Sequence, residues 1–305
     1  MPHSFFEKQI LSSGGSVSKV LDDNVRGLIW LCGKNQEDQE LLGTILDRHA
    51  QIGWIQLPMS GVEAFHKLMG KEGNRRRVWT SAKGCYSQPV AEHALTLSLS
   101  CLRGLNHRFQ SEQWGKPGGI SLYGLNVLLV GLGGIGISFL ELLRPFKCNV
   151  TDLRVKRVVG TRSLHQVLPN SDVVILAAAL TSETRNLFSK AEFELMKPNS
   201  VLINVARGEI IDTDRLVEVL RTNKLGGVGL DVTFPEPLPR GHVLWAMMRE
   251  SAKNLGGTNL IITPHTAESP DMIGPLLAER IRSNVEAFVR QDGSFLGRVD
   301  TDKGY

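Results

Sequence analysis

The sequence contains few cysteines, few aromatic residues and no strong excess of charge of either sign. Its 305 residues include four cysteines, 6% aromatic residues, and 35 basic against 31 acidic side chains. The cysteines stand far apart without a CxxC pair, which argues against a zinc knuckle and a disulfide framework and predicts a reducing, cytoplasmic location. The net charge of +4 is mild for a chain of this length, so no nucleic-acid partner is predicted.

The sequence also lacks a long uninterrupted apolar run. Its most apolar stretch, Val127–Leu143, contains four glycines and Glu141, which disqualifies it as a membrane span. The N-terminal residues include Glu7, Asp22 and Asp23 and show no secretory signal pattern. The histidines and acidic residues show no metal-ligand spacing, so no metal is predicted. With 42% apolar residues, a folded globule of two domains is expected.

Short β-branched runs alternate with helical patterns, which is typical of βαβ units around a parallel sheet. Early in the chain, Gly27–Leu31 and Ile52–Gln56 are predicted strands and Asp38–His49 is a predicted helix. A long helical pattern at Gln88–Arg103 is predicted to separate two domains. A dinucleotide-binding sheet requires about six strands, and these are predicted at Leu125–Val130, Asn149–Thr151, Val173–Leu176, Val201–Asn204, Gly227–Leu230 and Leu260–Thr263.

A glycine-rich turn follows the first strand of this second series. The motif GLGGIG, between an apolar strand and a helical pattern, contains Gly131, Gly133, Gly134, Ile135 and Gly136. The first glycine permits a tight turn, the second lets the backbone approach a pyrophosphate, and the third lets helix and strand pack closely. Free N–H groups at the start of the helix favour an anion. The motif in this context predicts a dinucleotide cofactor.

The position that distinguishes NAD from NADP is expected about 20 residues further on. There the predicted strand Asn149–Asp152 is followed by Arg154, Lys156 and Arg157. If Arg154 stands at the strand end, it can pair with a 2′-phosphate, and NADP(H) is favoured. If the strand ends sooner, Asp152 binds the ribose hydroxyl and NAD(H) is the cofactor. The two side chains share one face of a strand, so NADP(H) is favoured and NAD(H) stays possible.

Three segments at the ends of later predicted strands carry polar side chains. They contain Arg207 in NVARGEIID, Glu236 in GLDVTFPEP and His265 in TPHTA. The carboxyl ends of strands in an open α/β sheet form the ligand crevice, so these side chains are expected to converge. A guanidinium holds a carboxylate, an imidazole donates a proton, and a carboxylate on the other ring nitrogen fixes the tautomer. This set suits hydride exchange at C2 of an acid, with nicotinamide as the hydride source.

These motifs, in this order and spacing, resemble the NAD(P)-dependent D-2-hydroxyacid dehydrogenase family. The resemblance covers Ile52–His265, and the segments QLP and SAKG are similar to the glyoxylate/hydroxypyruvate reductase-like, 2-ketoacid-reducing branch. It implies an α/β fold in which a Rossmann-type, doubly wound parallel sheet is inserted in a flavodoxin-like substrate domain. The expected domains are residues 1–92 for substrate binding, 93–270 for the dinucleotide, and 271–305 as a return helix of the substrate domain.

The resemblance also implies roles for individual residues. Arg207 would orient the substrate, and His265 would be the general acid/base paired with Glu236. Asp231 would hold the nicotinamide carboxamide. Besides the glycine turn, the implied cofactor-binding residues are Arg154, Thr181, Ala206, Asp231 and His265. The implied substrate-binding residues are Ser60, Gly61, Val62, Lys83, Gly84 and Arg207.

The implied activity is reduction of a small 2-oxo acid to a D-2-hydroxy acid by a homodimer, whose subunits would meet through the arm Arg108–Tyr123. A second function stays open: a cofactor-sensing binding protein, similar to corepressors that share the fold, would bind NAD(H) without turnover. Two further expectations concern local structure. His93 lies at an apolar spacing in the long helical pattern and is expected to pack rather than bind. Ala246–Gly257 is longer than the usual connection and is expected to form a surface loop near the site.

Overall fold

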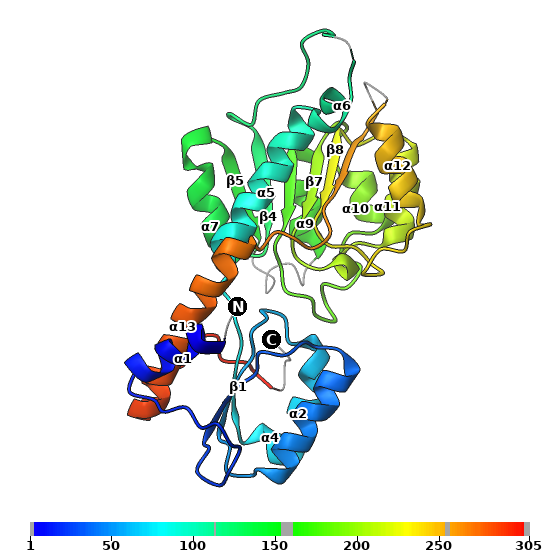
Figure 1. The fold of residues 1–305 in the computed structure, drawn as a ribbon. Helices are drawn as coiled ribbons and strands as arrows, with labels where there is room; N and C mark the ends of the chain where they lie inside the picture. The colour runs from blue at the N-terminus through cyan, green and yellow to red at the C-terminus, as the bar shows by residue number, and fades with distance from the viewer. Residues whose placement is uncertain (1–2, 113, 154–160, 254–256, 302–305) are drawn as a thin grey trace. The chain divides into compact units, whose positions relative to one another are not determined.

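The computed structural model describes residues 3–112, 114–153, 161–253 and 257–301, and these form two compact units (Figure 1). Unit 1 comprises Met1–Tyr86 and Ser269–Tyr305, and unit 2 comprises Ser87–Glu268. Unit 2 is therefore an insertion in the sequence of unit 1. The division falls after residues 86 and 268, whereas the sequence predicts domain boundaries after residues 92 and 270. The roles assigned to the domains stay predictions.

Unit 1 is built around a short parallel sheet in which the described strands pair in the order β1-β2-β3. Ile55 and Trp79 of this sheet are buried in a core that also contains Phe65. The strands are β1 (Gly27–Ile29), β2 (Trp54–Gln56) and β3 (Val78–Thr80). The helices of the unit are α1 (His3–Ser12), α2 (Gln36–Arg48), η1 (Glu63–Phe65), α3 (His66–Met69), α4 (Glu72–Arg75) and α13 (Pro270–Arg290).

Helix α13 follows unit 2 in the sequence and belongs to unit 1, where it packs against α1 (Figure 1). It begins at Pro270, directly after the N-cap residue Ser269, because proline is tolerated in the first turn of a helix. Its fully buried Asn284 connects the helix to β2, since Nδ2 donates to Oε1 of Gln56 at 2.7 Å. This buried hydrogen bond fixes the helix against the sheet.

The described strands of unit 2 form a six-stranded parallel sheet in the order β5-β4-β6-β7-β8-β9. The chain runs from β4 to β5 on one side and then crosses to β6 on the other side, so the winding reverses beside β4. The bounds are β4 (Asn126–Val130), β5 (Asn149–Leu153), β6 (Val173–Leu176), β7 (Val201–Asn204), β8 (Gly227–Leu230) and β9 (Asn259–Ile262). All six predicted strands are present, and the predicted α/β fold class with a Rossmann-type parallel sheet is confirmed.

The long helix α5 (Ser87–Leu102) lies against β7, β8 and β9 of this sheet and beside α7 (Figure 1). A Cβ atom added to Gly227, at the start of β8, would lie 2.6 Å from Cβ of Cys101, so the end of α5 lies at the amino ends of the strands. Its first turns accordingly lie toward the carboxyl ends. The other helices are α6 (Leu105–Phe109), α7 (Gly134–Leu143), η2 (Arg144–Phe146), α9 (Thr161–Val167), η3 (Leu168–Asn170), α10 (Lys190–Leu195), η4 (Gly208–Ile210), α11 (Thr213–Arg221) and α12 (Val243–Ser251).

The expectation of a surface loop over residues 246–257 is wrong in its first part, because α12 extends to Ser251. Leu244 of this helix is buried, and Met247 and Met248 pack against the core of unit 2. Apolar residues three and four positions apart form one face of a helix, and this spacing was the signal for α12. Residues 254–256 lie outside the described part of the chain.

Candidate active site

The glycine turn joins β4 to α7 at the point where the winding of the sheet reverses. Gly131 has a φ of 105°, and a Cβ atom there would lie 2.6 Å from the carbonyl carbon of Ala177. A Cβ atom at Gly136 would lie 2.3 Å from the carbonyl oxygen of Gly131, whereas one at Gly133 would meet nothing within 4 Å. The turn is therefore tightly packed at Gly131 and Gly136, whereas Gly133 between them has open space beside it.

The open position lies at the start of a helix. Gly133 is the N-cap residue of α7 and provides no side-chain cap, and Gly134 and Ile135 follow in the first turn. The first N–H groups of a helix have no partner within it, and together with the helix dipole they attract an anion. A pyrophosphate fits this turn, because Gly133 has no side chain and a Cβ atom there would meet nothing within 4 Å.

Arg207, Glu236 and His265 follow the carboxyl ends of three neighbouring parallel strands, β7, β8 and β9. The structure brings the last two together: Nδ1 of His265 lies 2.6 Å from Oε1 of Glu236. The other carboxylate oxygen, Oε2, accepts a hydrogen bond of 3.4 Å from the amide of Thr233. The side chains of His265 and Glu236 are 31% and 36% exposed, so a small ligand can reach this pair.

Glu236 determines the electrostatic state of His265. The hydrogen bond from the imidazole to the carboxylate, together with the carboxylate charge, raises the pKa of His265 above its ordinary value, and Asp231 adds to this. Burial and the positive charge of Arg207 act in the opposite direction. The net effect favours the imidazolium, which is the form that can donate a proton.

Arg207 lies directly beside the loop that carries Glu236. Its Nη1 atom donates to the carbonyl oxygen of Ala206 at 2.7 Å, and its own carbonyl oxygen accepts from Nδ2 of Asn204 at 2.9 Å. A Cβ atom at Gly208 would lie 2.0 Å from the carbonyl carbon of Thr233. Only a residue without a side chain permits this approach, so Gly208 is what allows the arginine segment to lie against the loop after β8.

Asp231 directly follows β8 and is buried, with 2% exposure. Its Oδ1 atom accepts from Oγ1 of Thr263 at 2.6 Å and from the amide of Thr266 at 2.9 Å, and its Oδ2 atom accepts from the amide of Ala267 at 3.2 Å. Burial raises the pKa of Asp231, but hydrogen bonds from His93, Thr263 and the Thr266 amide outweigh it and lower the pKa below the ordinary value. Asp231 is therefore a buried carboxylate anion.

His93, which the sequence predicts to pack rather than bind, also makes polar contacts within unit 2. Its Nε2 atom lies 2.9 Å from Oγ1 of Thr263 and 3.4 Å from Oδ1 of Asp231. The apolar spacing of α5 describes the neighbours of His93 in the helix, and it gave no sign of the polar groups at the ends of β8 and β9. The proline and histidine of the TPHTA motif were visible in the sequence, but the partner that α5 supplies was not.

Two further predicted cofactor residues, Thr181 and Ala206, follow β6 and β7 of the same sheet. Thr181 follows β6, and its Oγ1 atom lies 3.2 Å from Oγ1 of Thr184. Ala206 is buried, and its amide donates to Oδ1 of Asn204 at 3.0 Å. Asp152 is exposed in β5. Arg154, on which the preference for NADP(H) depends, lies outside the described residues, so the cofactor assignment of these residues stays a prediction.

The predicted substrate residues lie in two loops of unit 1 that follow the carboxyl ends of β2 and β3. Oγ of Ser60 donates to the carbonyl oxygen of Ala82 at 3.2 Å, so the loop with Ser60, Gly61 and Val62 is joined to the loop with Lys83 and Gly84. Gly84 has a φ of 80°, a conformation that favours glycine. The structure thus unites the two segments, and substrate binding by them stays a prediction.

Arg280, which the sequence did not indicate as part of the site, holds the loop that contains Lys83 and Gly84 by hydrogen bonds to its backbone. Arg280 of α13 donates through Nη1 to the carbonyl oxygen of Ser81 at 2.7 Å and through Nη2 to that of Lys83 at 2.9 Å. Burial lowers the pKa of Arg280 from its ordinary value. Only the fold could reveal this contact, because the partners are almost 200 residues apart in the chain.

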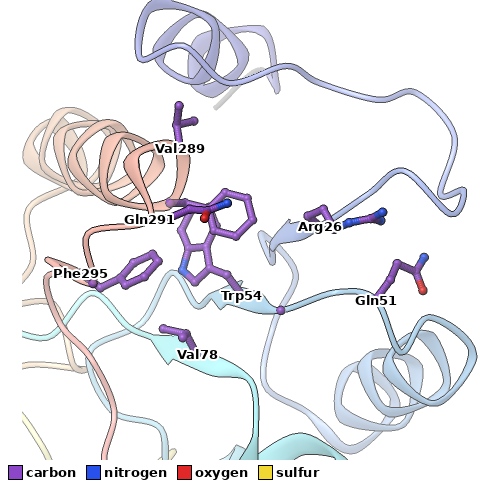
Figure 2. Close-up of a pocket in the computed structure, with 10 residues that line it drawn as sticks. Arg26, Gln51, Trp54, Val78, Val289, Gln291 and Phe295 are labelled. Atoms are coloured by element: carbon purple, nitrogen blue, oxygen red, sulfur yellow. The ribbon is translucent and has the colours of Figure 1, made fainter.

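A cavity of about 560 Å³ in unit 1 lies apart from these loops (Figure 2). Trp54 is flanked there by Phe288 and Phe295, with ring centroids 5.2 and 5.7 Å away. The cavity includes Trp54 and Val78, the first residues of β2 and β3, so it lies at the amino edge of the sheet. The predicted substrate loops lie at the opposite edge.

Among the described residues, no group of three or more His, Cys, Asp or Glu side chains is arranged to hold a metal ion. No helix within the described ranges has the length and apolar character that crossing a membrane requires.

Residues 95–267 match the NAD binding domain of D-isomer specific 2-hydroxyacid dehydrogenases. The chain belongs to this family. The resemblance noted from the glycine turn and the three polar motifs is thereby confirmed. A D-isomer specific 2-hydroxyacid dehydrogenase is a nicotinamide-dependent oxidoreductase, which agrees with the fit of the glycine turn to a dinucleotide.

Relatives of this 2-hydroxyacid dehydrogenase include a glyoxylate reductase from Pyrococcus furiosus. It is 30% identical over 241 residues, which are 72% of this chain and 68% of the relative. Two solved structures show the same fold. One is a D-isomer specific 2-hydroxyacid dehydrogenase from Xanthobacter autotrophicus Py2 in complex with NADPH and MES, with a TM-score of 0.78, 21% identity, and coverage of 100% and 96% of the two chains. The other is a D-lactate dehydrogenase from Aquifex aeolicus complexed with NAD and lactic acid, with a TM-score of 0.68, 24% identity, and coverage of 96% and 94%.

Proposed function

We propose that this dehydrogenase reduces a small 2-oxo acid to a D-2-hydroxy acid with NAD(P)H. The observation that carries the proposal is the 2.6 Å contact between His265 and Glu236, with the charge of Arg207 acting on the same imidazole. A guanidinium, an imidazole and a carboxylate are the groups that a 2-oxo acid needs when its carbonyl carbon receives a hydride. The relative named glyoxylate reductase supports this substrate class.

Each residue of the site has a distinct role in this proposal. Arg207 binds the substrate carboxylate and orients the neighbouring carbonyl group. Glu236 occupies Nδ1 of His265, which leaves Nε2 to donate its proton to the carbonyl oxygen. Bound nicotinamide supplies the hydride. The open position at Gly133 and the first turn of α7 hold the cofactor phosphates, and Thr181, Ala206 and Asp231 line the rest of its cleft.

We further propose NADP(H) as the favoured cofactor, with NAD(H) as the alternative. Arg154, Lys156 and Arg157 support NADP(H), because a guanidinium pairs with a 2′-phosphate by charge-assisted hydrogen bonds. The exposed Asp152 in β5 supports NAD(H). Steady-state kinetics with both cofactors decide between them: Arg154→Asp is expected to raise KM for NADPH and leave KM for NADH unchanged. Equal KM values for NADPH in the variant and the wild type would assign the preference to another residue.

The activity itself is tested with glyoxylate, hydroxypyruvate, pyruvate and a branched 2-oxo acid, by following the oxidation of NADPH and of NADH. Turnover of at least one acid, abolished by His265→Ala, is expected. Tight NAD(H) binding without turnover of any 2-oxo acid would instead support the alternative of a cofactor-sensing binding protein.

Assembly and location are part of the same proposal. The arm Arg108–Tyr123 contains Trp114, whose side chain is fully exposed, and Ile120 and Tyr123, which are also exposed. We propose that a second copy of the chain covers this arm in a homodimer, and sedimentation as a monomer at micromolar concentration would contradict this. Cytoplasmic location stays a prediction from the cysteine pattern; the four cysteines are free in the structure.

A further inference from the structure

His93 approaches the site from a helix that the sequence places far from it. Its imidazole reaches Thr263, which is 170 residues away in the chain, at 2.9 Å between Nε2 and Oγ1. The same nitrogen lies 3.4 Å from Oδ1 of Asp231, and the side chains of His93 and Asp231 are 20% and 1% exposed. This contact connects α5 to the loops after β8 and β9 inside unit 2.

The hydrogen atoms of this cluster can be assigned by counting donors. A threonine hydroxyl has one proton, and Thr263 gives it to Oδ1 of Asp231 at 2.6 Å because the carboxylate has none to offer. Oγ1 of Thr263 must therefore accept from Nε2 of His93. The chain of hydrogen bonds runs in one direction, from His93 through Thr263 to Asp231, and it requires a proton on Nε2.

Asp231 in turn holds the loop that carries the candidate acid/base. Its carbonyl oxygen accepts from the amide of His265 at 2.8 Å, and its carboxylate accepts from the amides of Thr266 and Ala267 at 2.9 and 3.2 Å. His265 has a φ of 52°, a left-handed conformation that is unfavourable for a residue with a side chain. The three amide contacts of Asp231 hold the backbone from which the imidazole extends.

We propose that His93 is a positioning residue that holds Thr263 and Asp231 in place and thereby keeps His265 aligned with Glu236. The inference rests on the proposed function, in which His265 is the proton donor. His93 touches neither of these two side chains in the described contacts; it acts through Thr263 and Asp231. Buried polar networks of this kind are stable only when each member has its partner, so removal of the first donor affects every later member.

Two amide variants test the role at constant polarity. In His93→Gln the side-chain amide has the length to donate to Thr263, whereas in His93→Asn it is too short. The kcat for 2-oxo acid reduction is expected to stay within about threefold of wild type in His93→Gln and to fall about tenfold in His93→Asn, which is at the upper end of the effect of one hydrogen bond between uncharged groups. Equal kcat values in the two variants would overturn the proposal.

His107→Leu is the matched control. His107 is also a half-buried histidine with one hydrogen bond, from Nδ1 to the carbonyl oxygen of Ala252 at 3.0 Å, and it lies outside the catalytic cluster. Its replacement is expected to leave kcat unchanged. A tenfold loss in this control as well would show that any half-buried histidine has the same effect, and would refute a specific role for His93.

A second readout does not depend on turnover. In NMR titrations of histidine-labelled protein, the pKa of His265 is expected to decrease in His93→Asn and to stay at the wild-type value in His93→Gln and His107→Leu. If the wild type reduces no 2-oxo acid, the proposed function fails, and this titration still decides whether His93 positions His265. An unchanged pKa of His265 in His93→Asn would contradict the positioning role even in an active enzyme.

Discussion

Replacement of Glu236 by glutamine removes the carboxylate that favours the protonated form of His265. The glutamine side chain has nearly the same shape as the glutamate side chain. The contact from Nδ1 of His265 to Oε1 of Glu236 is 2.6 Å long. A hydrogen bond to a charged group contributes about 1.5–3 kcal/mol. The side chains of His265 and Glu236 are 31% and 36% exposed, so solvent screening reduces this to about 1–2 kcal/mol. The expected loss of kcat in Glu236→Gln is therefore about 5- to 30-fold.

The pH profile is expected to change in a defined direction. Reduction requires the protonated imidazole, so kcat/KM falls as the pH rises through the pKa of His265. Glu236 makes the largest contribution to raising that pKa, while burial and the charge of Arg207 lower it. Without the carboxylate, the alkaline limb of the profile is expected to move to lower pH.

The assay follows the absorbance of the reduced cofactor over a range of 2-oxo acid concentrations at each pH, which gives both kcat and kcat/KM. Glu192→Gln is the matched control, because Glu192 forms another histidine–glutamate contact in unit 2, 2.7 Å from Nε2 of His165 and outside the candidate site. The Glu192→Gln control is expected to retain the wild-type kcat, and the alkaline limb of its pH profile is expected to stay at the wild-type pH. Wild-type kcat and an unmoved alkaline limb in Glu236→Gln would refute the assignment of this carboxylate to the acid/base pair.

Two other predictions concern the cofactor turn and the loop support. Gly136→Ala is expected to lower the free energy of unfolding by about 1–3 kcal/mol in urea titrations, because its Cβ atom would lie 2.3 Å from the carbonyl oxygen of Gly131. Gly133→Ala, whose Cβ atom would meet nothing within 4 Å, is the matched control, and equal losses in the two variants would contradict the packing argument. Arg280→Met removes hydrogen bonds to the carbonyl oxygens of Ser81 and Lys83 and is expected to raise KM for the 2-oxo acid about 5- to 10-fold at constant KM for the cofactor. Arg282→Met removes ion pairs with Glu279 and Glu286 of the same helix and is the matched control. An equal rise in KM for the 2-oxo acid in this control would count against the support of the loop by Arg280.

Local patterns predicted the sheet of unit 2 well, because buried parallel strands are short apolar runs bounded by turn residues. The glycine turn, Arg207, Glu236 and His265 were also identifiable, since each directly follows such a run. The contact partners were harder to predict. His93 meets Thr263 across 170 residues, and no helical periodicity indicates which strand end a helix crosses.

The difference at α12 has a local cause, because its apolar face is short, with Leu244, Met247 and Met248 next to polar residues. The contacts of Arg280 have a long-range cause. The role of Arg280 depends on the return of α13 to unit 1, which places two carbonyl oxygens of a distant loop at its guanidinium. Long-range contacts of this kind follow from topology rather than from spacing.

In the proposed reaction, Arg207, Glu236 and His265 assist the transfer of a hydride from the nicotinamide to C2 of a 2-oxo acid. This transfer can be followed with deuterium. The protein is incubated with pyruvate and with hydroxypyruvate in the presence of NADPH or NADH in which both hydrogens at C4 of the nicotinamide are deuterium, and the product is analysed by mass spectrometry and chiral chromatography. The expected product is a D-2-hydroxy acid with deuterium at C2, formed by the wild type and not by His265→Ala. A product without deuterium, an L-2-hydroxy acid, or equal formation by His265→Ala would contradict the proposed reaction.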